Sequence, residues 1–212
     1  MLNVLYSNID WQHIKTVGFD MDGTLYDEYD FIKQVYYKIN KSLIDDEDIL
    51  SFMLNRWLEK GSSYPNIFNE AYDKHKNNTY SQEVFIQKAL RIFRTYSPTL
   101  LLPERNKKLL TYFKNNFNVF LITDGNYELQ KKKFLALGLD EYFEEKNVIF
   151  TGKYGPEFHK PNIKSLDLLD IDLTKSIYFG DRNTDKKFSV LANMKFKKVY
   201  NMIEVKEWQK RF

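Results

Sequence analysis

The segment Gly18–Leu25, which reads G-F-D-M-D-G-T-L, constrains this chain more than any other. The short run Thr16–Phe19 predicts a buried strand that ends as the segment begins. Side chains two residues apart in a strand point to the same side, so Asp20 and Asp22 can reach one spot beyond the strand. Open α/β folds bind ligands at this edge of the sheet. The pattern predicts two cooperating carboxylates, although alone it also fits a simple turn.

Composition sets the class of protein and excludes several chemistries. Apolar residues make up 43% of the chain and charged residues 29%, which is ordinary for a globular protein with a sizeable core. The absence of cysteine excludes disulfides, thiolate catalysis and cysteine-based zinc sites, and it fits a cytoplasmic protein. A net charge of +3 is too small to indicate a nucleic acid polymer as the partner.

We expect neither export nor insertion into a membrane. Residues 1–14 lack the basic and apolar stretches of a secretory signal peptide. No apolar run in the chain approaches the length needed to span a bilayer. These features favour a cytoplasmic location without a membrane partner.

The segment that follows the two aspartates predicts four amphipathic helices in succession. Apolar side chains recur at steps of three and four residues over 32–43, 49–58, 67–72 and 85–93. The acidic stretch 45–48 is suited to cap the second helix at its N-terminus. The stretch 61–65, G-S-S-Y-P, breaks the pattern and is a candidate loop facing the site. Together these helices predict a small bundle.

The second half of the chain alternates between short apolar strands and helical segments. We expect strands at 119–122, 148–150, 176–179 and 198–200, with helices between them that include one at 163–169. This alternation is typical of a parallel sheet in a doubly wound α/β fold. The first strand, at 16–19, belongs to the same sheet.

The helical bundle is an insertion into that sheet fold. Roughly a hundred residues separate the first strand from the second, whereas a simple β-α-β crossover takes roughly 30. We therefore expect a doubly wound, Rossmann-like core formed by residues 1–26 and 99–212. The α-helical cap bundle is expected to comprise residues 27–98.

Polar side chains follow several of the expected strands. Thr123 follows the second strand, Asp181 and Asp185 follow the strand at 176–179, and Lys160 precedes the next helical segment. In a parallel sheet these loops emerge at one edge, together with the first two aspartates. Clustered carboxylates repel one another unless a hard cation neutralises them, and such oxygen ligands suit Mg²⁺.

The same set of groups suits phosphate chemistry. A metal, a lysine, a threonine hydroxyl and backbone amides of a turn together fit a phosphate dianion. A carboxylate nucleophile near the metal gives an aspartyl-phosphate. A second carboxylate can protonate the leaving oxygen and later activate water.

Four motifs in order give the chain a resemblance to a known family. They are D-M-D-G-T-L at 20–25, L-I-T-D-G-N at 121–126, the lysine of H-K-P-N at position 160, and G-D-R-N-T-D at 180–185. With these motifs the chain resembles phosphatases of the haloacid dehalogenase superfamily that carry an α-helical cap after the first motif. The resemblance extends over roughly residues 16–200.

The resemblance implies three catalytic residues. Asp20 is expected to be the nucleophile and a Mg²⁺ ligand. Asp22 is expected to be the general acid and base, with its backbone carbonyl also on the metal. Lys160 is expected to neutralise charge on the nucleophile and the phosphate.

The resemblance also implies binding residues. Thr123 and the Asp124 amide are expected to hold the phosphoryl oxygens. Asp181 is expected to bind Mg²⁺, and Asp185 to support the metal's water shell or to orient Lys160. Two roles are open for Arg182: a contact with the cap or the substrate, or an ion pair at the surface.

Three functions remain open at this point. The leading hypothesis is a Mg²⁺-dependent phosphomonoesterase of a small phosphorylated metabolite, such as a sugar phosphate or a nucleotide, acting through an aspartyl-phosphate. The dehalogenases of the superfamily lack the second aspartate, so Asp22 favours phosphoryl transfer. A phosphomutase of the β-phosphoglucomutase type would use the same intermediate. A catalytically silent binding protein on this fold predicts the loss of a motif residue, and none is missing.

Overall fold

The computed structural model describes residues 5–6, 8–75, 79–173 and 175–205. The chain divides into two compact units, one within 1–28 and 100–212 and the other Tyr29–Thr99. The sequence-based boundaries of the insertion were 27 and 98. Among the described residues, no helix combines the length and the apolar character needed to cross a membrane.

The larger unit is built on one six-stranded sheet in the order β3-β2-β1-β4-β5-β6. The first five strands pair in parallel, and only β6 is antiparallel to its neighbour β5. The motif-bearing strand β1 therefore lies in the middle of the sheet, between β2 and β4. The strand bounds are Thr16–Phe19 for β1, Asn118–Thr123 for β2, Val148–Phe150 for β3, Ser176–Gly180 for β4, Lys195–Tyr200 for β5 and Ile203–Glu204 for β6.

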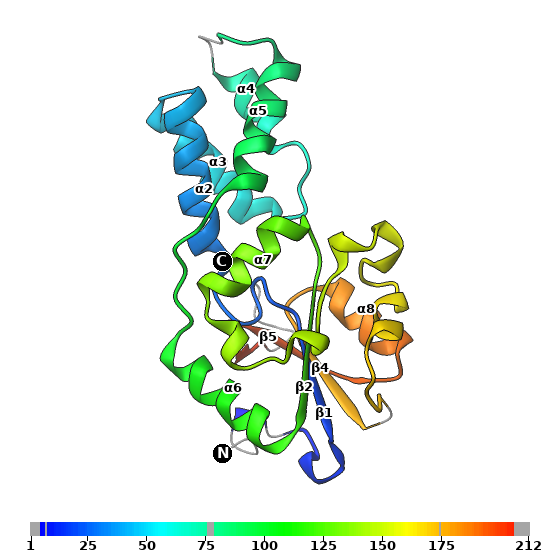
Figure 1. The fold of residues 1–212 in the computed structure, drawn as a ribbon. Helices are drawn as coiled ribbons and strands as arrows, with labels where there is room; N and C mark the ends of the chain where they lie inside the picture. Colours follow the sequence, from blue (N-terminus) through cyan, green and yellow to red (C-terminus); the bar gives the residue numbers. More distant parts are fainter. Residues whose placement is uncertain (1–4, 7, 76–78, 174, 206–212) are drawn as a thin grey trace. The chain divides into compact units, whose positions relative to one another are not determined.

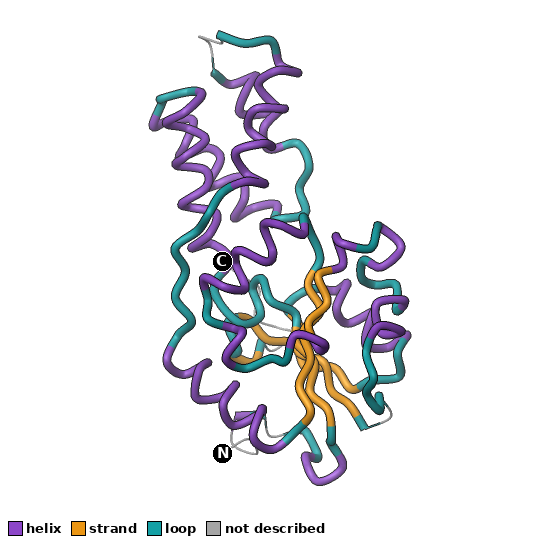
Figure 2. Tube along the Cα trace, in the orientation of Figure 1, coloured by secondary structure: helices purple, strands orange, loops and turns teal. Residues whose placement is uncertain are grey.

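Helices cover both faces of this sheet, as expected for a doubly wound fold. Figure 1 shows α6 and α7 on one side of the strands and α8 on the other, and Figure 2 shows the short helical turns beside α8. The helix bounds are Glu104–Asn116 for α6, Tyr127–Ala136 for α7 and Asn183–Leu191 for α8. The short 3-10 turns are Trp11–His13, Leu139–Glu141, Glu145–Asn147, Thr151–Lys153, Pro156–Phe158 and Lys164–Leu168.

Alternating side chains of the central strands form a core on each face. Phe19 of β1 packs against Phe113 of α6 and Phe179 of β4, with ring centroids 5.4 Å away in both contacts. On the other face a buried cluster is centred on Phe120, Tyr178 and Phe188. Aromatic rings thus fill both layers, and burial of this apolar surface is the main stabilising term.

Gly18 is required by the close packing of the second face. A Cβ at this position would lie 2.1 Å from the ring of Phe120, its register partner on β2. No ordinary contact allows that distance, so the Phe120 ring lies flat across the glycine. The glycine that opens the first motif therefore serves the core rather than a turn.

The described residues of the smaller unit form four helices, as the apolar spacing predicts. Asp46 caps the second of them by accepting hydrogen bonds from the amides of Asp48 and Ile49, at 2.9 and 3.3 Å. Buried apolar side chains line each helix on one face. The helix bounds are Glu28–Leu43 for α2, Glu47–Lys60 for α3, Ile67–Lys74 for α4 and Gln82–Thr95 for α5.

Three elements of the larger unit differ from the sequence-based expectation, and the first is β5, which begins at Lys195 instead of at the expected residue 198. The segment expected as a helix at 163–169 is a 3-10 helix, Lys164–Leu168, that buries Leu166 and then becomes extended at Leu169. A run this short with one buried apolar anchor is typical of 3-10 structure. The strand β6 was not expected, because two residues carry no readable alternation.

A salt bridge in the helical unit gives a testable dependence of stability on pH. Arg56 of α3 binds Glu70 of α4 through two nitrogens, at 2.6 and 2.8 Å, and Tyr64 also donates to Glu70. Hydrogen bonds from Arg56 and then Tyr64 lower the pKa of Glu70 to about 2. A carboxyl with a depressed pKa stabilises the fold above its unfolded value, near 4.5, and loses this effect as the pH falls toward 2.

We expect Glu70→Gln to lower the melting temperature by a few degrees at pH 7, as for other partly exposed ion pairs. The difference from wild type should shrink between pH 4.5 and 2. Thermal unfolding followed by circular dichroism over this pH range measures it. A difference that stayed constant with pH would contradict an electrostatic origin.

Candidate active site

The ends of three adjacent strands place the site. β1 ends at Phe19, β2 at Thr123 and β4 at Gly180, and these strands are neighbours in the sheet. The amide of Asp20 donates to the carbonyl of Phe179 at 2.9 Å, so Asp20 continues the ladder by one residue. The side chains that follow these strands therefore share one edge of the sheet, as the sequence predicts.

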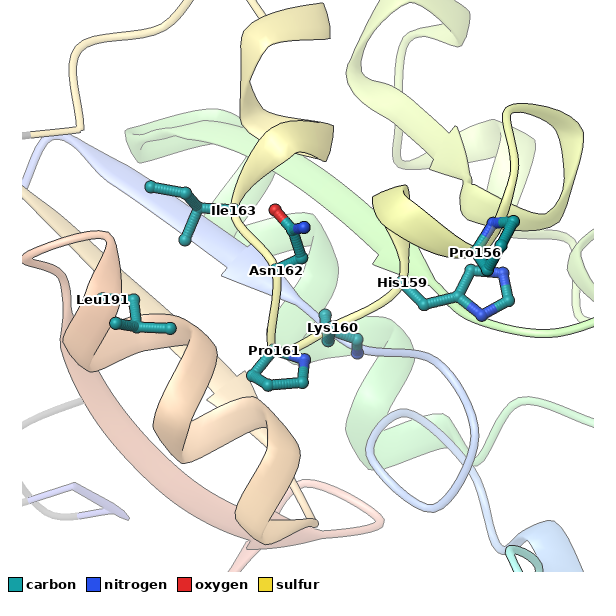
Figure 3. A pocket seen from close by; sticks show the side chains of 7 residues that line it. All are labelled: Pro156, His159, Lys160, Pro161, Asn162, Ile163 and Leu191. Atoms are coloured by element: carbon teal, nitrogen blue, oxygen red, sulfur yellow. The ribbon is translucent and has the colours of Figure 1, made fainter.

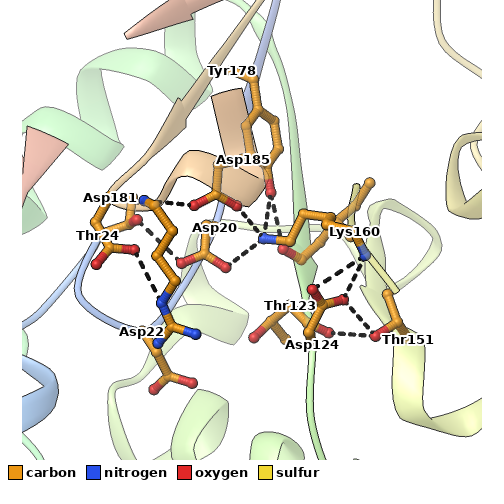
Figure 4. A network of polar contacts seen from close by, with 12 residues as sticks. Asp20, Asp22, Thr24, Thr123, Asp124, Thr151, Lys160, Tyr178, Asp181 and Asp185 are labelled. Atoms are coloured by element: carbon orange, nitrogen blue, oxygen red, sulfur yellow. Dashed lines mark hydrogen bonds and ion pairs between the residues drawn. The ribbon is translucent and has the colours of Figure 1, made fainter. Parts of the chain in front are cut away.

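Lys160 joins two of the predicted carboxylates. Its Nζ lies 2.7 Å from Oδ1 of Asp20 and 2.6 Å from Oδ1 of Asp185, and it donates to the hydroxyl of Tyr178 at 3.2 Å. Figure 4 shows the lysine entering between the two aspartates. Its side chain is only 3% exposed, so these contacts replace nearly all of its hydration. The structure thus brings together three residues that lie far apart in the sequence.

Burial and neighbouring charges set the protonation of this cluster. Burial raises the pKa of Asp20 well above its usual value, and Asp185 and Asp181 add to this against the opposing charge of Lys160. Burial favours the neutral form of Lys160, but the carboxylates of Asp185 and Asp20 outweigh it and raise the pKa of the lysine. The lysine therefore stays charged, whereas the nucleophile candidate has an excess of negative neighbours.

The carboxylates of Asp20, Asp181 and Asp185 have the composition of a divalent metal site. One oxygen from each lies within 4.8 Å of the others. Lys160 pairs with Asp20 and Asp185, and Arg182 pairs with Asp181 and Glu28, so the four carboxylates carry two more negative charges than these two side chains balance. The donors are all oxygen, which suits Mg²⁺. The residues present therefore fit the metal that the motifs predict.

The Asp185 carboxylate accepts hydrogen bonds from two groups of the protein. Its Oδ1 accepts from Lys160, and its Oδ2 accepts from the Arg182 amide at 3.0 Å, at the N-terminus of α8. Both oxygens are thus engaged with the protein. Of the two roles expected for Asp185, this geometry favours orienting Lys160.

Gly23 allows the first motif to pass close to the carboxylates of the candidate metal site. Its φ is +76°, and a Cβ there would lie 2.6 Å from Oδ2 of Asp181. A side chain at this position would therefore displace a carboxylate of the site and also strain the backbone, by about 1 kcal/mol.

We expect Gly23→Ala to fold but to reduce catalytic turnover roughly 100-fold, because a displacement of about 1 Å at a reacting centre has that effect. The same variant should need more Mg²⁺ to reach half of its own maximal rate. Turnover measured across a Mg²⁺ titration tests both points. Equal Mg²⁺ dependence in variant and wild type would place Asp181 outside the metal site.

The loop after β2 is held in part by Thr151, which the sequence did not single out. Thr151 donates to Oδ1 of Asp124 at 2.8 Å, and the Lys160 amide donates to the same carboxylate at 3.2 and 3.3 Å. The Asp124 side chain therefore ties together the loops that carry Thr123 and Lys160. Its expected role in phosphate binding rests on the backbone amide, which is a separate group.

Asp22 is held by three donors. Tyr26 donates to Oδ1 at 2.5 Å, Lys133 lies 2.9 Å from the same oxygen, and Gln130 donates to Oδ2 at 2.6 Å. Burial alone would raise the pKa of Asp22, but the Lys133 charge and hydrogen bonds from Gln130 and Tyr26 lower it. None of these donors was singled out from the sequence.

Arg182 forms an ion pair rather than an open contact. Its Nη2 lies 2.9 Å from Oε2 of Glu28, and its Nε lies 3.7 Å from Oδ1 of Asp181. The structure contains an ion pair, but not the surface pair that the sequence left open, because the partner Glu28 is buried and lies within the residues 27–98 expected as the cap. Glu28 is almost fully buried, so this pair fixes the Arg182 side chain beside the carboxylates of the candidate metal site.

A pocket of about 590 Å³ lies beside the carboxylates but is distinct from them. Of the seven predicted site residues, only Lys160 lines it. The other lining residues, shown in Figure 3, are Pro156, His159, Pro161, Asn162, Ile163 and Leu191. The pocket is mostly apolar, and apart from Lys160 it contains none of the groups expected to bind phosphate.

Comparison with known proteins agrees with this geometry. Residues 14–188 match the family model of a haloacid dehalogenase-like hydrolase. The glyceraldehyde 3-phosphate phosphatase of Methanocaldococcus jannaschii is 28% identical over 182 residues, which cover 80% of this chain and 77% of that protein. The protein of the same name from Pyrococcus abyssi is 26% identical over 178 residues, covering 80% and 74%. A phosphatase is the enzyme class that these comparisons support.

Solved structures share the fold. A HAD-superfamily hydrolase of subfamily IA from Geobacter sulfurreducens has a TM-score of 0.63 at 20% identity, covering 87% of this chain and 86% of that one. A protein described as a HAD-hydrolase from Bacillus subtilis, solved bound to magnesium, has a TM-score of 0.64 at 18% identity, covering 86% and 85%. At these identities the likeness extends to the fold and no further.

Proposed function

Because the chain belongs to the haloacid dehalogenase-like hydrolase family, we propose that it is a Mg²⁺-dependent phosphatase of small phosphorylated metabolites. The observation that carries the proposal is the buried cluster of Asp20, Lys160 and Asp185, with Asp22 held separately two residues from the nucleophile. A hydrolase that transfers the phosphoryl group through a carboxylate needs these two kinds of aspartate.

The proposed reaction has two steps with balanced atoms. In the first, Asp22, which is ionised at rest, takes the proton of a substrate phosphate that binds as its monoanion; a carboxylate oxygen of Asp20 then attacks phosphorus, the bond to the leaving oxygen breaks, and Asp22 passes that proton to the leaving oxygen. In the second, Asp22 takes a proton from water, the water oxygen attacks phosphorus, and the bond to Asp20 breaks to release inorganic phosphate. Each step then has a proton donor or acceptor in place.

The remaining residues of the site bind the phosphoryl group or the metal ion and neutralise charge. Lys160 balances charge on Asp20 and on the incoming phosphate. Thr123 and the Asp124 amide hold phosphoryl oxygens at the end of β2. Asp20, the Asp22 carbonyl and Asp181 would hold Mg²⁺, supported by Asp185. The bound cation would supply electrostatic stabilisation of the charge on the transferring group.

The substrate class is a small phosphate monoester. The curated relatives are named for glyceraldehyde 3-phosphate, so a triose phosphate is the first candidate. Other sugar phosphates and nucleotides complete the set that the proposal includes. The helical unit, which we propose as the cap domain, is the part that would select among them.

Release of inorganic phosphate tests the proposal. Purified protein is incubated with triose phosphates, hexose phosphates, nucleotides and p-nitrophenyl phosphate, with Mg²⁺ and with a chelator. We expect release that depends on Mg²⁺. A mutase would instead require a bisphosphate activator and release little phosphate. No release from any compound in Mg²⁺, the aryl phosphate included, would contradict the proposal.

A further inference from the structure

Two residues of α7 reach back to the first motif. Gln130 and Lys133 lie one turn apart on this helix, and both contact the carboxylate of Asp22, more than a hundred residues away in the sequence. The Lys133 side chain is 4% exposed and that of Asp22 is 10% exposed. A buried ammonium needs a charged partner to offset its lost hydration, and Asp22 is such a partner.

The donors around Asp22 leave its second oxygen partly open. An ionised carboxylate has about four acceptor positions, two on each oxygen. Tyr26 and Lys133 occupy the two on Oδ1, and Gln130 occupies one on Oδ2. No further donor to Oδ2 is found among the described residues, so one position remains on this oxygen. The orientation of the carboxylate is fixed by donors on both of its oxygens, and the open position is where a leaving oxygen or a water would bind.

Gln130 ties this orientation to the phosphate-binding loop. Its Nε2 also lies 2.8 Å from Oγ1 of Thr123 and 2.7 Å from the carbonyl of Asp124. The two hydrogens of Nε2 are shared among these three oxygens. Where one of them points at the threonine oxygen, the hydroxyl proton is left to turn toward another acceptor, such as a phosphoryl oxygen. One amide therefore links the proton-transfer group to the group that would hold the phosphate.

The two lysines of the site divide the negative charge between them. Lys160 faces Asp20 and Asp185, whereas Lys133 faces Asp22. The carboxylate that moves protons is thus neutralised independently of the carboxylates suited to the metal. Lys133 can therefore hold the Asp22 carboxylate in both steps of the proposed reaction.

We infer that Lys133 is a positioning residue, which rests on the proposed phosphatase function. With Tyr26 it holds Oδ1 of Asp22 so that Oδ2 is presented for proton transfer to the leaving oxygen and from water. A purely structural ion pair would contribute to folding and leave the proton transfers unaffected. The two interpretations differ in how the rate depends on the leaving group.

Leaving groups separate the two steps. An alkyl phosphate needs a proton from Asp22 as its bond breaks, whereas p-nitrophenolate leaves without one. Hydrolysis of the aspartyl-phosphate needs Asp22 as a base with either substrate. Removing Lys133 should therefore slow both steps for an alkyl phosphate but only the second step for p-nitrophenyl phosphate.

The experiment compares Lys133→Met with Lys131→Met, which removes an exposed lysine from the same helix. In rapid mixing with Mg²⁺, Lys133→Met should release one equivalent of p-nitrophenolate at close to the wild-type rate and then turn over slowly. Its single-turnover rate on an alkyl phosphate should fall roughly a hundredfold, at the lower end of the contribution of general acid–base catalysis. Lys131→Met should match wild type in all three rates.

Several outcomes would overturn the inference. If Lys133→Met slows the p-nitrophenolate burst as much as the alkyl reaction, the lysine acts in binding or folding. If it changes neither reaction, Asp22 is positioned without it. Should Lys133→Met fail to fold, Tyr26→Phe removes a donor from the same oxygen without a charge and should give the same pattern more weakly. Wild-type protein that releases phosphate from neither substrate would refute the proposed function itself.

Discussion

Asp20→Asn should abolish phosphate release while the protein remains folded. An amide is a poor nucleophile and forms no aspartyl-phosphate, so we expect turnover to fall about 10⁴- to 10⁶-fold, as for other covalent nucleophiles. The substitution keeps the shape of the side chain and the acceptor oxygen for Lys160. Phosphate release with the best substrate, in saturating Mg²⁺, measures the loss.

A stability measurement separates lost chemistry from lost folding. Burial and the neighbouring Asp185 and Asp181 raise the pKa of Asp20. A carboxyl with a raised pKa opposes folding once the pH exceeds its unfolded value, because the folded state then disfavours the charged form. In chelator at pH 7, Asp20→Asn should therefore melt at the same temperature as wild type or higher. An inactive variant that melts well below wild type would indicate a structural defect instead.

The fold could be predicted largely because its strands are short, apolar and followed by turn residues. The runs at 119–122, 148–150 and 176–179 coincide with β2, β3 and β4 within two residues. A strand that is buried on both faces is a continuous apolar run, so it can be recognised in the sequence before the strands that pair with it are known. The 3-10 form of Lys164–Leu168 and the two-residue β6 depend on local packing, and no period in the sequence encodes them.

The site could be predicted as far as its motifs extend. Asp20 directly follows β1, Asp185 lies in the first turn of α8 just after β4, and Lys160 lies in the loop between two 3-10 turns. The three side chains meet at one edge of the sheet. Lys133 was not found, since it ends a run of three lysines that is typical of a solvated helix face. The available signal was its spacing from the apolar Leu129 and Phe134, which places it on the buried side of α7.

Lys160→Met should disrupt both the fold and the reaction. The substitution leaves Asp20 and Asp185 buried without their shared cation, and breaking a buried pair in this way costs about 3–5 kcal/mol. The carboxylates raise the pKa of Lys160, so the wild-type lysine stabilises the fold at all pH values below its unfolded pKa, near 10.5. Its effect is therefore fully present at neutral pH.

The loss should depend on the protonation of Asp20. Without Lys160 the pKa of Asp20 rises further, and the variant becomes less stable as the pH rises through the range in which this carboxyl ionises. The difference in melting temperature from wild type should therefore narrow as the pH falls from 7 to 4. Lys164→Met, which removes a half-exposed lysine of the same segment, should show no such trend.

Magnesium should restore the stability of Lys160→Met more than its activity. A divalent cation bound by Asp20 and Asp181 neutralises the same carboxylates that the lysine pairs with, and it stabilises the folded state in proportion to its occupancy. It does not replace the ammonium that faces the incoming phosphate, so turnover should remain at least roughly 100-fold below wild type. Melting curves and phosphate release across one Mg²⁺ series separate the two effects. If Mg²⁺ fully restored the turnover of Lys160→Met, Lys160 would serve only to balance the charge of the metal-free carboxylates. If the melting temperature of Lys160→Met did not change with Mg²⁺, Asp20 and Asp181 would not be metal ligands.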